Sequence, residues 1–420
     1  MKKVLMIAHQ FPPIGGSGVQ RTVKFIKYLP EFGWKGSVFT RQAKKAQLTD
    51  STLSSDIPQD TQVYRSAAWD LSEWPFPLNL AGKFIRRKIL VPDGERLWGL
   101  FARRQAIHAA RTGGYDMLYS TSQPFSTHLL AMEVKKELPS LPWVVDLRDE
   151  WTNNSFVRAY GYSPARIRQE KAMERQAFEM ADAVVINTPF MRDNSVRDYP
   201  WLKDKFHVIP NGFDLEDFAG LEQGRKNDRF TLTYTGLIYG NTSPETVFKA
   251  VSGLIREGCI QPGEFRLRFI GRYKPDLLEG MAREHQLGQV IEVLPYMPHR
   301  ESIQNLLWSD SVLLLLGEDT EAIYTGKLME YINTGKPILA SIPSKGAAAS
   351  LIQETKTGFV AHCGDVTATA EHILSMVKNW RQGKALFQPD LSKVARYERK
   401  ELTKNLAEVF NGLCERKPGK

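Results

Sequence analysis

The sequence predicts an α/β protein built from two doubly wound domains, each with a parallel β-sheet. Short apolar runs alternate with longer amphipathic segments, which is the pattern of βαβ units. The alternation restarts after a polar, glycine-containing stretch at residues 216–229. The chain has 420 residues, which is too long for one ordinary domain and suits two of about 200 residues each. We therefore expect domains at residues 1–200 and 201–395, followed by a C-terminal segment at 396–420.

The first half opens with a short apolar run from Val4 to Ala8. No small-residue cleavage pattern follows this run, so we interpret it as a buried strand and not as a signal peptide. The strands expected in this half lie at residues 3–9, 35–40, 116–122, 143–149, 182–188 and 206–214. The helices expected between them lie at 19–33, 126–138 and 169–181.

The second half repeats this organisation with helix-length segments between its apolar runs. Its expected strands lie at residues 230–240, 266–272, 291–298, 311–318 and 337–343. After the last of them, the amphipathic pattern at 394–415 predicts one long C-terminal helix.

The composition excludes several classes of protein. A hydrophobic content of 42% and a charged content of 25% are typical of a globular protein, and no apolar run reaches the roughly 18–20 residues that span a bilayer. Three cysteines without paired spacing argue against disulfides and against a zinc site. No basic-aromatic RNA pattern is present, so a nucleic-acid partner is not expected. Together these features predict a cytoplasmic protein.

The charge balance permits an anionic partner. Lysine and arginine number 56 against 47 acidic residues, a formal net charge of +9. Nucleotide phosphates and anionic lipid headgroups are the candidates. The alternative is a mildly basic surface without any such partner.

Ligands of open parallel sheets bind beyond the carboxyl ends of the strands, so the residues after each apolar run are the candidates for a site. After the first strand, Gly15, Gly16 and Gly18 precede a helix, where backbone N–H groups could hold an anion. Their spacing matches neither G-x-G-x-x-G nor the Walker pattern, which weakens the dinucleotide and P-loop interpretations. The alternative is that these glycines only form a tight turn.

Other polar residues follow later strands of the first half. Asp146, Arg148 and Asp149 end an apolar strand, where they either contact a ligand or form a structural Arg–Asp pair. His128 lies near the start of a helix and has both a structural and a functional interpretation. Asn211 lies in an Asn-Gly turn, with substrate contact as the second interpretation.

In the second half, Lys327 and Glu330 are three residues apart near the start of an expected helix. The helix N-terminus and the lysine could hold a pyrophosphate. One turn further on, the carboxylate could accept two hydrogen bonds from a ribose diol. The alternative is a surface ion pair that contributes only about 0.2–0.5 kcal/mol.

The order of the motifs resembles the GT-B-fold glycosyltransferases, specifically the retaining family 4 group of bacterial cell-surface sugar transferases. The resemblance covers nearly the whole chain. It rests on MKKVLMIAHQFPPIGGSGVQR, WVVDLRDEW, MADAVVINTPF, VIPNGFD, LTYTGLIYG, FIGR, HRESIQNLLWSDSVLLLL and GKLMEYINTGKPILAS.

This resemblance implies two Rossmann-like domains facing across a cleft. The first domain would be the acceptor side, the second would bind a nucleoside diphosphate sugar, and the last helix would cross back to the first domain. By the same resemblance, Glu330 holds the donor ribose, Lys327 precedes it as in many members, and Gly15 and Gly16 lie near the donor phosphates. The other expected donor-binding residues are Gly236, Gly271, Gly326 and Leu328. Members of this family usually need no bound metal.

Two departures from the family pattern concern the donor sugar and the phosphates. The family often places a second glutamate eight residues before the ribose glutamate, but that position is Ala322 here. Glu318 and Glu321 are the nearest glutamates, and with Arg148 and Asn211 they form the set of expected sugar or acceptor contacts. The loop after the first strand of the second half also lacks the usual basic pair, so Arg272 and Lys327 are the expected replacements.

The reaction that the resemblance implies is hexosyl transfer to a hydroxyl with retention of anomeric configuration, in cell-surface polysaccharide biosynthesis. Departure of the diphosphate builds negative charge, which Lys327 and Arg272 would stabilise. His128 and Asp149 would orient the sugar or the acceptor, and these four residues form the expected catalytic set. The acceptor would be a glycan or a lipid-linked glycan.

The segment from Trp69 to Arg104 joins three tryptophans with a basic cluster. It either lies on an anionic membrane, which would make the protein peripheral on its inner face, or packs on the first domain.

Three other functions stay open. They are a GT-B sugar-nucleotide 2-epimerase, a nicotinamide-dependent oxidoreductase, which the missing fingerprint disfavours, and a degenerate, nucleotide-sugar-binding scaffold.

Overall fold

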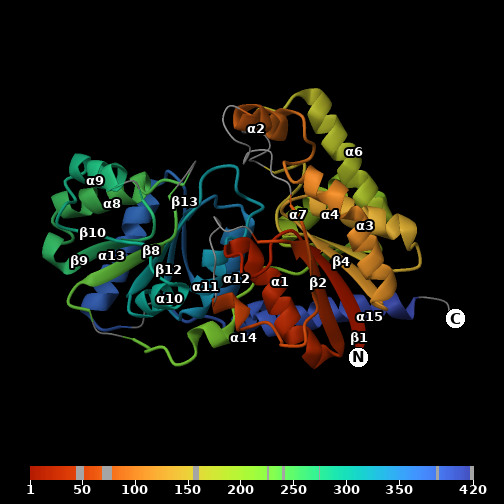
Figure 1. Cartoon of the computed structure of the whole chain (residues 1–420). Helices are drawn as coiled ribbons and strands as arrows, with labels where there is room; N and C mark the ends of the chain where they lie inside the picture. The colour runs from red at the N-terminus through yellow and green to blue at the C-terminus, as the bar shows by residue number, and fades with distance from the viewer. Residues whose placement is uncertain are drawn as a thin grey trace. The chain divides into compact units, whose positions relative to one another are not determined.

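The structure is a computed structural model that describes residues 1–43, 52–68, 78–154, 160–224, 227–238, 242–273, 275–384 and 387–416. The chain folds into two compact units (Figure 1). The first unit comprises Met1–Asn211 and Arg399–Lys420, and the second comprises Gly212–Glu398. Each unit has its own parallel sheet and its own apolar core.

The first unit is built on a seven-stranded sheet whose strand order is β3-β2-β1-β4-β5-β6-β7. Its strands are β1 (Lys2–Ala8), β2 (Trp34–Arg41), β3 (Val63–Ser66), β4 (Met117–Thr121), β5 (Trp143–Leu147), β6 (Ala183–Ile186) and β7 (Phe206–Val208). Every pairing in the sheet is parallel, so the carboxyl ends of its strands share one edge. The first strand is buried, as its apolar run predicts.

Helices cover this sheet and complete its core. They are α1 (Ser17–Tyr28), α2 (Leu78–Lys88), α3 (Arg96–Thr112), α4 (Ser126–Glu137), α6 (Pro164–Met180), α7 (Pro189–Asp198) and α15 (Arg399–Glu415). Although α15 comes from the far end of the chain, its Phe410 ring lies 5.0 Å from that of Trp34 in this core.

The second unit has a six-stranded sheet with the order β10-β9-β8-β11-β12-β13, again parallel throughout. Its strands are β8 (Phe230–Thr235), β9 (Phe265–Ile270), β10 (Ile291–Leu294), β11 (Ser311–Leu315), β12 (Ile338–Ile342) and β13 (Gly358–His362). Its helices are α8 (Glu245–Arg256), α9 (Pro275–Glu284), α10 (His299–Leu307), α11 (Gly326–Asn333), α12 (Ala347–Thr355), α13 (Val366–Arg381) and α14 (Leu391–Val394).

The expectation of one continuous helix over 394–415 is wrong at its start. A short 3-10 turn at Ala395–Tyr397 follows α14, and Glu398 is extended, with φ −67° and ψ 137°. Glu398 also forms an isolated parallel bridge with Phe213, so α15 begins only at Arg399. Among the described residues, no helix is long and apolar enough to cross a bilayer.

Candidate functional site

Three predicted residues of the second unit pack tightly at the carboxyl edge of its sheet. Gly236 follows β8 and has a φ of +107°, which favours glycine. A Cβ on Gly236 would lie 2.3 Å from Lys327 Cε, and one on Gly271 would lie 2.2 Å from the Gly236 carbonyl oxygen. Gly236 therefore lets the lysine stem approach the backbone, and Gly271 lets the backbone that follows β9 approach the backbone that follows β8.

Lys327 lies in the first turn of α11 and is partly buried. Its Nζ donates to the Tyr234 hydroxyl at 2.6 Å and lies 4.2 Å from the centre of that ring. Burial lowers the pKa of Lys327 to about 8, although the nearby Glu330 opposes this shift. The result is a poorly solvated ammonium group, which gains more from an anionic ligand than a fully solvated one would.

The N-terminus of α11 carries Gly326 and a side-chain cap. The Thr325 hydroxyl accepts from the Leu328 N–H at 3.2 Å, while the Leu328 side chain is buried. In this structure the Leu328 N–H is thus used by the cap, and its expected contact with the donor stays a prediction.

Glu330 does not form a surface pair with Lys327. Its Oε1 lies 2.8 Å from Nε2 of His299, the first residue of α10, and its side chain is 22% exposed. His299 is not among the residues that the sequence predicts for the site. The only signal was its position in the Pro-His-Arg-Glu stretch that follows β10.

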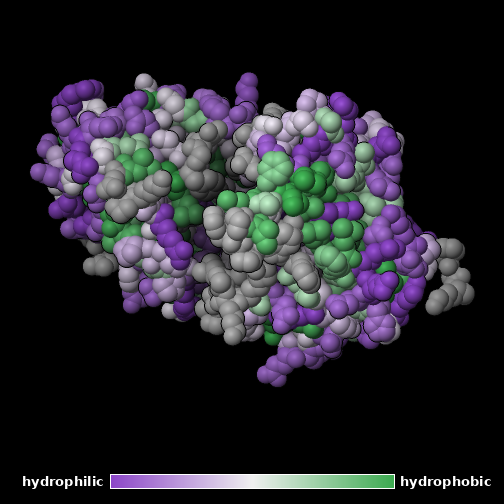
Figure 2. Space-filling view, turned by 45° about the horizontal axis from the view of Figure 1, so that its top comes forward, coloured by the Kyte–Doolittle hydropathy of each residue, from purple (hydrophilic) through white to green (hydrophobic). Residues whose placement is uncertain are grey.

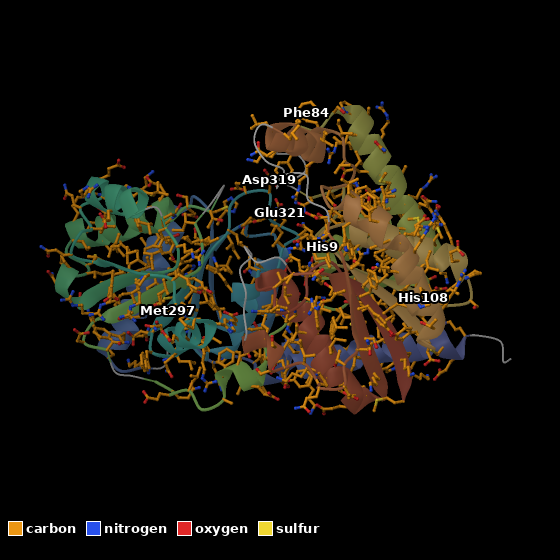
Figure 3. All side chains as sticks on the ribbon, viewed as in Figure 1. His9, Phe84, His108, Met297, Asp319 and Glu321 are labelled. Carbon is orange, nitrogen blue, oxygen red and sulfur yellow. The ribbon has the colours of Figure 1, made fainter. Side chains whose placement is uncertain are left out.

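The other predicted residues of this unit are more exposed. Arg272 follows β9, and its guanidinium lies 4.8 Å from the ring centre of the exposed Tyr296. Glu321 is exposed on the loop after β11, and its carbonyl accepts from the Ala347 N–H at 2.6 Å (Figure 3).

Glu318 forms a small polar cluster with His362 and Cys363. Its Oε1 lies 3.1 Å from both His362 Nε2 and Cys363 Sγ. The spacing of these three atoms would suit a divalent cation, since all lie within 4.8 Å of one another. However, His362 Nδ1 faces the Ser344 N–H at 3.4 Å, whereas a metal-bound imidazole would carry a proton there.

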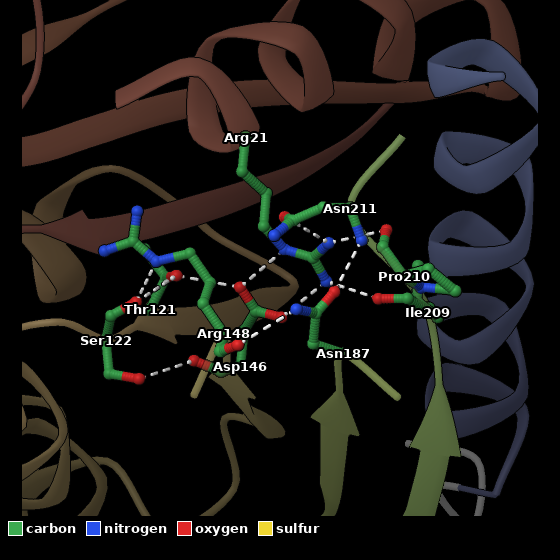
Figure 4. Close-up of polar contacts among 9 residues, drawn as sticks. All are labelled: Arg21, Thr121, Ser122, Asp146, Arg148, Asn187, Ile209, Pro210 and Asn211. Atoms are coloured by element: carbon green, nitrogen blue, oxygen red, sulfur yellow. Dashed lines mark hydrogen bonds and ion pairs between the residues drawn. The ribbon is translucent and has the colours of Figure 1, made fainter. Parts of the chain in front are cut away.

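In the first unit, the polar groups at the strand ends are largely paired with each other (Figure 4). Arg21 of α1 donates to both carboxylate oxygens of Asp146, at 3.0 and 2.7 Å, and to the carbonyls of Ile209 and Pro210. Burial alone would raise the pKa of Asp146, but the Arg21 guanidinium holds it below its usual value. The structural Arg–Asp pair therefore exists, with Arg21 as the partner of Asp146.

Arg148 and Asn211 take part in the same network. The Arg148 guanidinium donates to the carbonyls of Gly18, Ser122 and Gln123. The Asn211 N–H donates to Asn187 Oδ1 at 2.6 Å. Both residues hold backbone segments together, and their contact with a sugar stays a prediction.

His128 and Asp149 are the predicted residues of this unit that retain polar atoms for a ligand. His128 is buried, and its Nδ1 lies 2.9 Å from Ser120 Oγ. Its Nε2 has no hydrogen-bond partner among the described residues. Burial lowers the pKa of His128 to about 3, so this imidazole is neutral. Asp149 is half-buried, and burial raises its pKa against the opposing effect of Arg148.

Gly16 caps α1 in a conformation that only glycine adopts readily. Its φ is +122°, and a Cβ built there would meet no described atom within 4 Å. No described side chain caps this helix. Gly15, by contrast, is buried. The open space at Gly16 is compatible with a ligand approaching the backbone.

Two family models match successive parts of the chain. Residues 16–212 match the glycosyl transferase 4-like domain, and residues 221–416 match the glycosyl transferases group 1. The chain belongs to the family-4-like glycosyltransferases.

A curated relative and two solved structures are similar to this glycosyltransferase. The relative, a D-inositol 3-phosphate glycosyltransferase from Corynebacterium urealyticum, is 22% identical over 258 residues, 57% of this chain and 59% of that protein. A glycosyltransferase from Rickettsia africae has a TM-score of 0.69 and 13% identity over 99% of each chain. S. aureus TarM, solved in complex with UDP, has a TM-score of 0.62 and 9% identity over 98% of this chain and 100% of that one.

These structural likenesses identify a two-domain, Rossmann-like GT-B fold. In the glycosyltransferase, each unit contributes its own group of candidate residues. The second unit brings together Lys327, Glu330, Gly236, Gly271 and Gly326.

Proposed function

We propose that this glycosyltransferase moves a hexosyl group from a nucleoside diphosphate sugar to a hydroxyl of a glycan or a lipid-linked glycan, with retention of configuration. We place it in cell-surface polysaccharide biosynthesis, at the cytoplasmic face of a membrane. The packing of Lys327 against Gly236, one turn before Glu330, carries the proposal. The similarity of this chain to TarM, which was solved with UDP, supports a nucleotide donor.

The diphosphate is held in the second unit by positive charge that the chain itself supplies. The Lys327 ammonium is poorly solvated, and the N-terminus of α11 adds a favourable field. Because Gly236 carries no side chain, the Lys327 stem packs directly against the backbone that follows β8. Because these groups neutralise the leaving diphosphate, we propose that the transferase needs no bound metal.

Glu330 accepts the ribose hydroxyls. Its carboxylate is partnered by His299 at 2.8 Å in the structure. Two vicinal hydroxyls would replace this contact with a pair of hydrogen bonds to the carboxylate oxygens.

In the transfer step, the bond between the anomeric carbon and the β-phosphate oxygen breaks. The acceptor oxygen bonds to the same carbon from the leaving-group face, and the β-phosphate takes the acceptor proton. Lys327 stabilises the charge that develops on this phosphate. His128 is neutral and can orient a hydroxyl through Nε2, and Asp149 can accept a hydrogen bond from the sugar or the acceptor.

Thermal stabilisation by nucleoside diphosphates and their sugars tests the donor site. At about 100 times its dissociation constant, the correct nucleotide adds roughly 2.7 kcal/mol to the free energy of unfolding. Glu330→Ala removes this gain. Glu245→Ala is the matched control because Glu245 also pairs with a histidine, His285, at 3.1 Å in the same unit. Equal stabilisation of wild type and Glu330→Ala would contradict the ribose assignment.

The lack of lysine or arginine at residues 236–245, after β8, favours the degenerate scaffold as the second candidate function. Nucleotide binding without release of the diphosphate from any donor sugar would identify it. Conversion of the donor sugar without an acceptor would instead identify a 2-epimerase.

A further inference from the structure

Large apolar side chains are exposed together in one region of the first unit. They lie on and just after α2, near the start of α3, and just before and at the start of α6. We call them the apolar patch, and they are Leu78, Leu80, Phe84, Ile89, Leu100, Phe101, Tyr160 and Ile167, between 38% and 61% exposed. Figure 2 shows hydrophobic residues gathered on a face of the first unit, with hydrophilic ones beside them.

Polar contacts join the three segments that carry the patch. Arg86 of α2 forms an ion pair with Glu95, in the turn before α3. Arg166 of α6 donates to the Pro92 carbonyl in the same turn at 2.9 Å. Residues 92–95 therefore tie together the three segments that carry the patch.

The charges around the patch are basic. Lys83, Lys88, Arg104 and Arg168 are exposed beside it. In the described residues 78–104 and 160–170, no acidic side chain is exposed, because Asp93 and Glu95 are half-buried and Glu170 is buried. An apolar face with a cationic rim matches the acyl chains and headgroups of an anionic bilayer.

The same turn connects the patch to the carboxyl edge of the sheet. Glu95 Oε2 lies 3.2 Å from Nε2 of His9, which directly follows β1 (Figure 3). Asp93 accepts from the Ser126 hydroxyl at 2.7 Å, at the start of α4. Residues 92–95 thus lie between the patch and the end of the first unit where an acceptor would bind.

We propose that the apolar patch docks this unit on an anionic membrane and presents it to a lipid-linked acceptor. This rests on the proposed transfer reaction and narrows its acceptor class. Phe84 and Leu80 enter the interface between headgroups and acyl chains, while Lys83 and Lys88 pair with anionic headgroups. The patch replaces the expected use of tryptophans: Trp98 is buried and donates to Ser66 at 2.8 Å, and Trp69 and Trp74 lie outside the described residues.

Co-sedimentation with phosphatidylglycerol vesicles and with phosphatidylcholine vesicles tests the proposal. Wild type should sediment with the anionic vesicles, and Phe84→Glu should lower this binding by at least about tenfold. Trp201→Glu is the matched control because it makes the same charge change at an apolar residue of equal exposure (60% against 61%) outside the patch. The control should bind like wild type.

A second pair of variants tests the charge. Lys83→Gln with Lys88→Gln should weaken binding about 30-fold, roughly fivefold per charge. The control Lys378→Gln with Lys384→Gln, at exposed lysines of the second unit, should leave binding unchanged. Nucleotide-induced stabilisation, measured without vesicles, reports on folding and on the donor site separately from membrane binding.

Three results would overturn the proposal: no binding to anionic vesicles, equal binding to neutral ones, or equal loss in Phe84→Glu and its control. A concentration-dependent dimer that Phe84→Glu abolishes, without vesicle binding, would assign the patch to a second copy of the chain instead.

Discussion

The low pKa of Lys327 has opposite consequences for two properties as the pH rises. It favours the stability of the folded chain, and it disfavours the binding of a diphosphate at the start of α11. Its pKa in the folded chain, about 8, lies below the usual 10.5 because of burial. Between these values the unfolded chain binds more protons, so this group adds stability as the pH rises through that window. A diphosphate, in contrast, requires the protonated ammonium.

We therefore expect donor affinity to fall as the pH rises from 7 to 9, since the protonated fraction of Lys327 falls from about 90% to about 10%. Titration of the nucleotide by calorimetry at several pH values measures this. Lys327→Met should bind weakly without this decline, and it should be at least as stable as wild type at pH 7 when no nucleotide is present. A wild-type affinity that is flat between pH 7 and 9 would contradict the role of Lys327.

Gly236→Ala should weaken donor binding. The new methyl group would lie 2.3 Å from Lys327 Cε, so the lysine side chain would have to move away. The substitution should also cost about 1–2 kcal/mol of stability through the positive φ at this position. Gly364→Ala shares the backbone cost, with a φ of +92°, but its Cβ meets no described atom within 4 Å. Nucleotide titration should therefore separate the two variants although their melting temperatures fall together.

At the scale of single elements, the side-chain cap at Thr325 determines where α11 begins. Thr325→Ala should lower the free energy of unfolding by about 1 kcal/mol, because the Leu328 N–H loses its acceptor. Thr325→Ser keeps the hydroxyl and should recover most of this loss in a urea titration. Equal losses in both variants would mean that the cap hydrogen bond is not the source of the stability.

The elements that could be predicted from sequence are those with strong apolar runs. The buried strands β1, β5 and β11 appear where their runs predict them. β3 and β13 were not predicted, because both are sheet-edge strands whose residues are mostly half-exposed. The break at Glu398 was also missed, because the amphipathic pattern continues through it.

The candidate site was only partly predictable for a related reason. Glycines and charged residues after strands are visible in the sequence, whereas their partners are chosen by the fold. Arg21 lies 125 positions from Asp146, and His299 lies 31 positions from Glu330. Neither separation in sequence matches the repeat of a helix or a strand, so these pairs cannot be predicted from one sequence.

At the scale of the whole molecule, each unit has a separate core, so we expect two thermal transitions in calorimetry. A nucleoside diphosphate should raise only the transition temperature of the second unit. Phe410→Ala should lower only the transition temperature of the first unit, because Phe410 is fully buried there. The loss in that unit's free energy of unfolding should be about 3–5 kcal/mol. Phe265→Ala, its counterpart in the core of the second unit, should have the opposite selectivity. A single transition that moves in both variants would contradict independent units.

The placement of α15 sets an order of assembly during translation. The core of the first unit needs Leu402, Leu406 and Phe410, which leave the ribosome after residues 212–398 have been made. The second unit can therefore close while the first still exposes the surface that α15 will cover. Once residues 212–398 have left the ribosome, the chain would carry a folded second unit and a first unit that still lacks α15, and this unfinished unit would be the natural target for a chaperone.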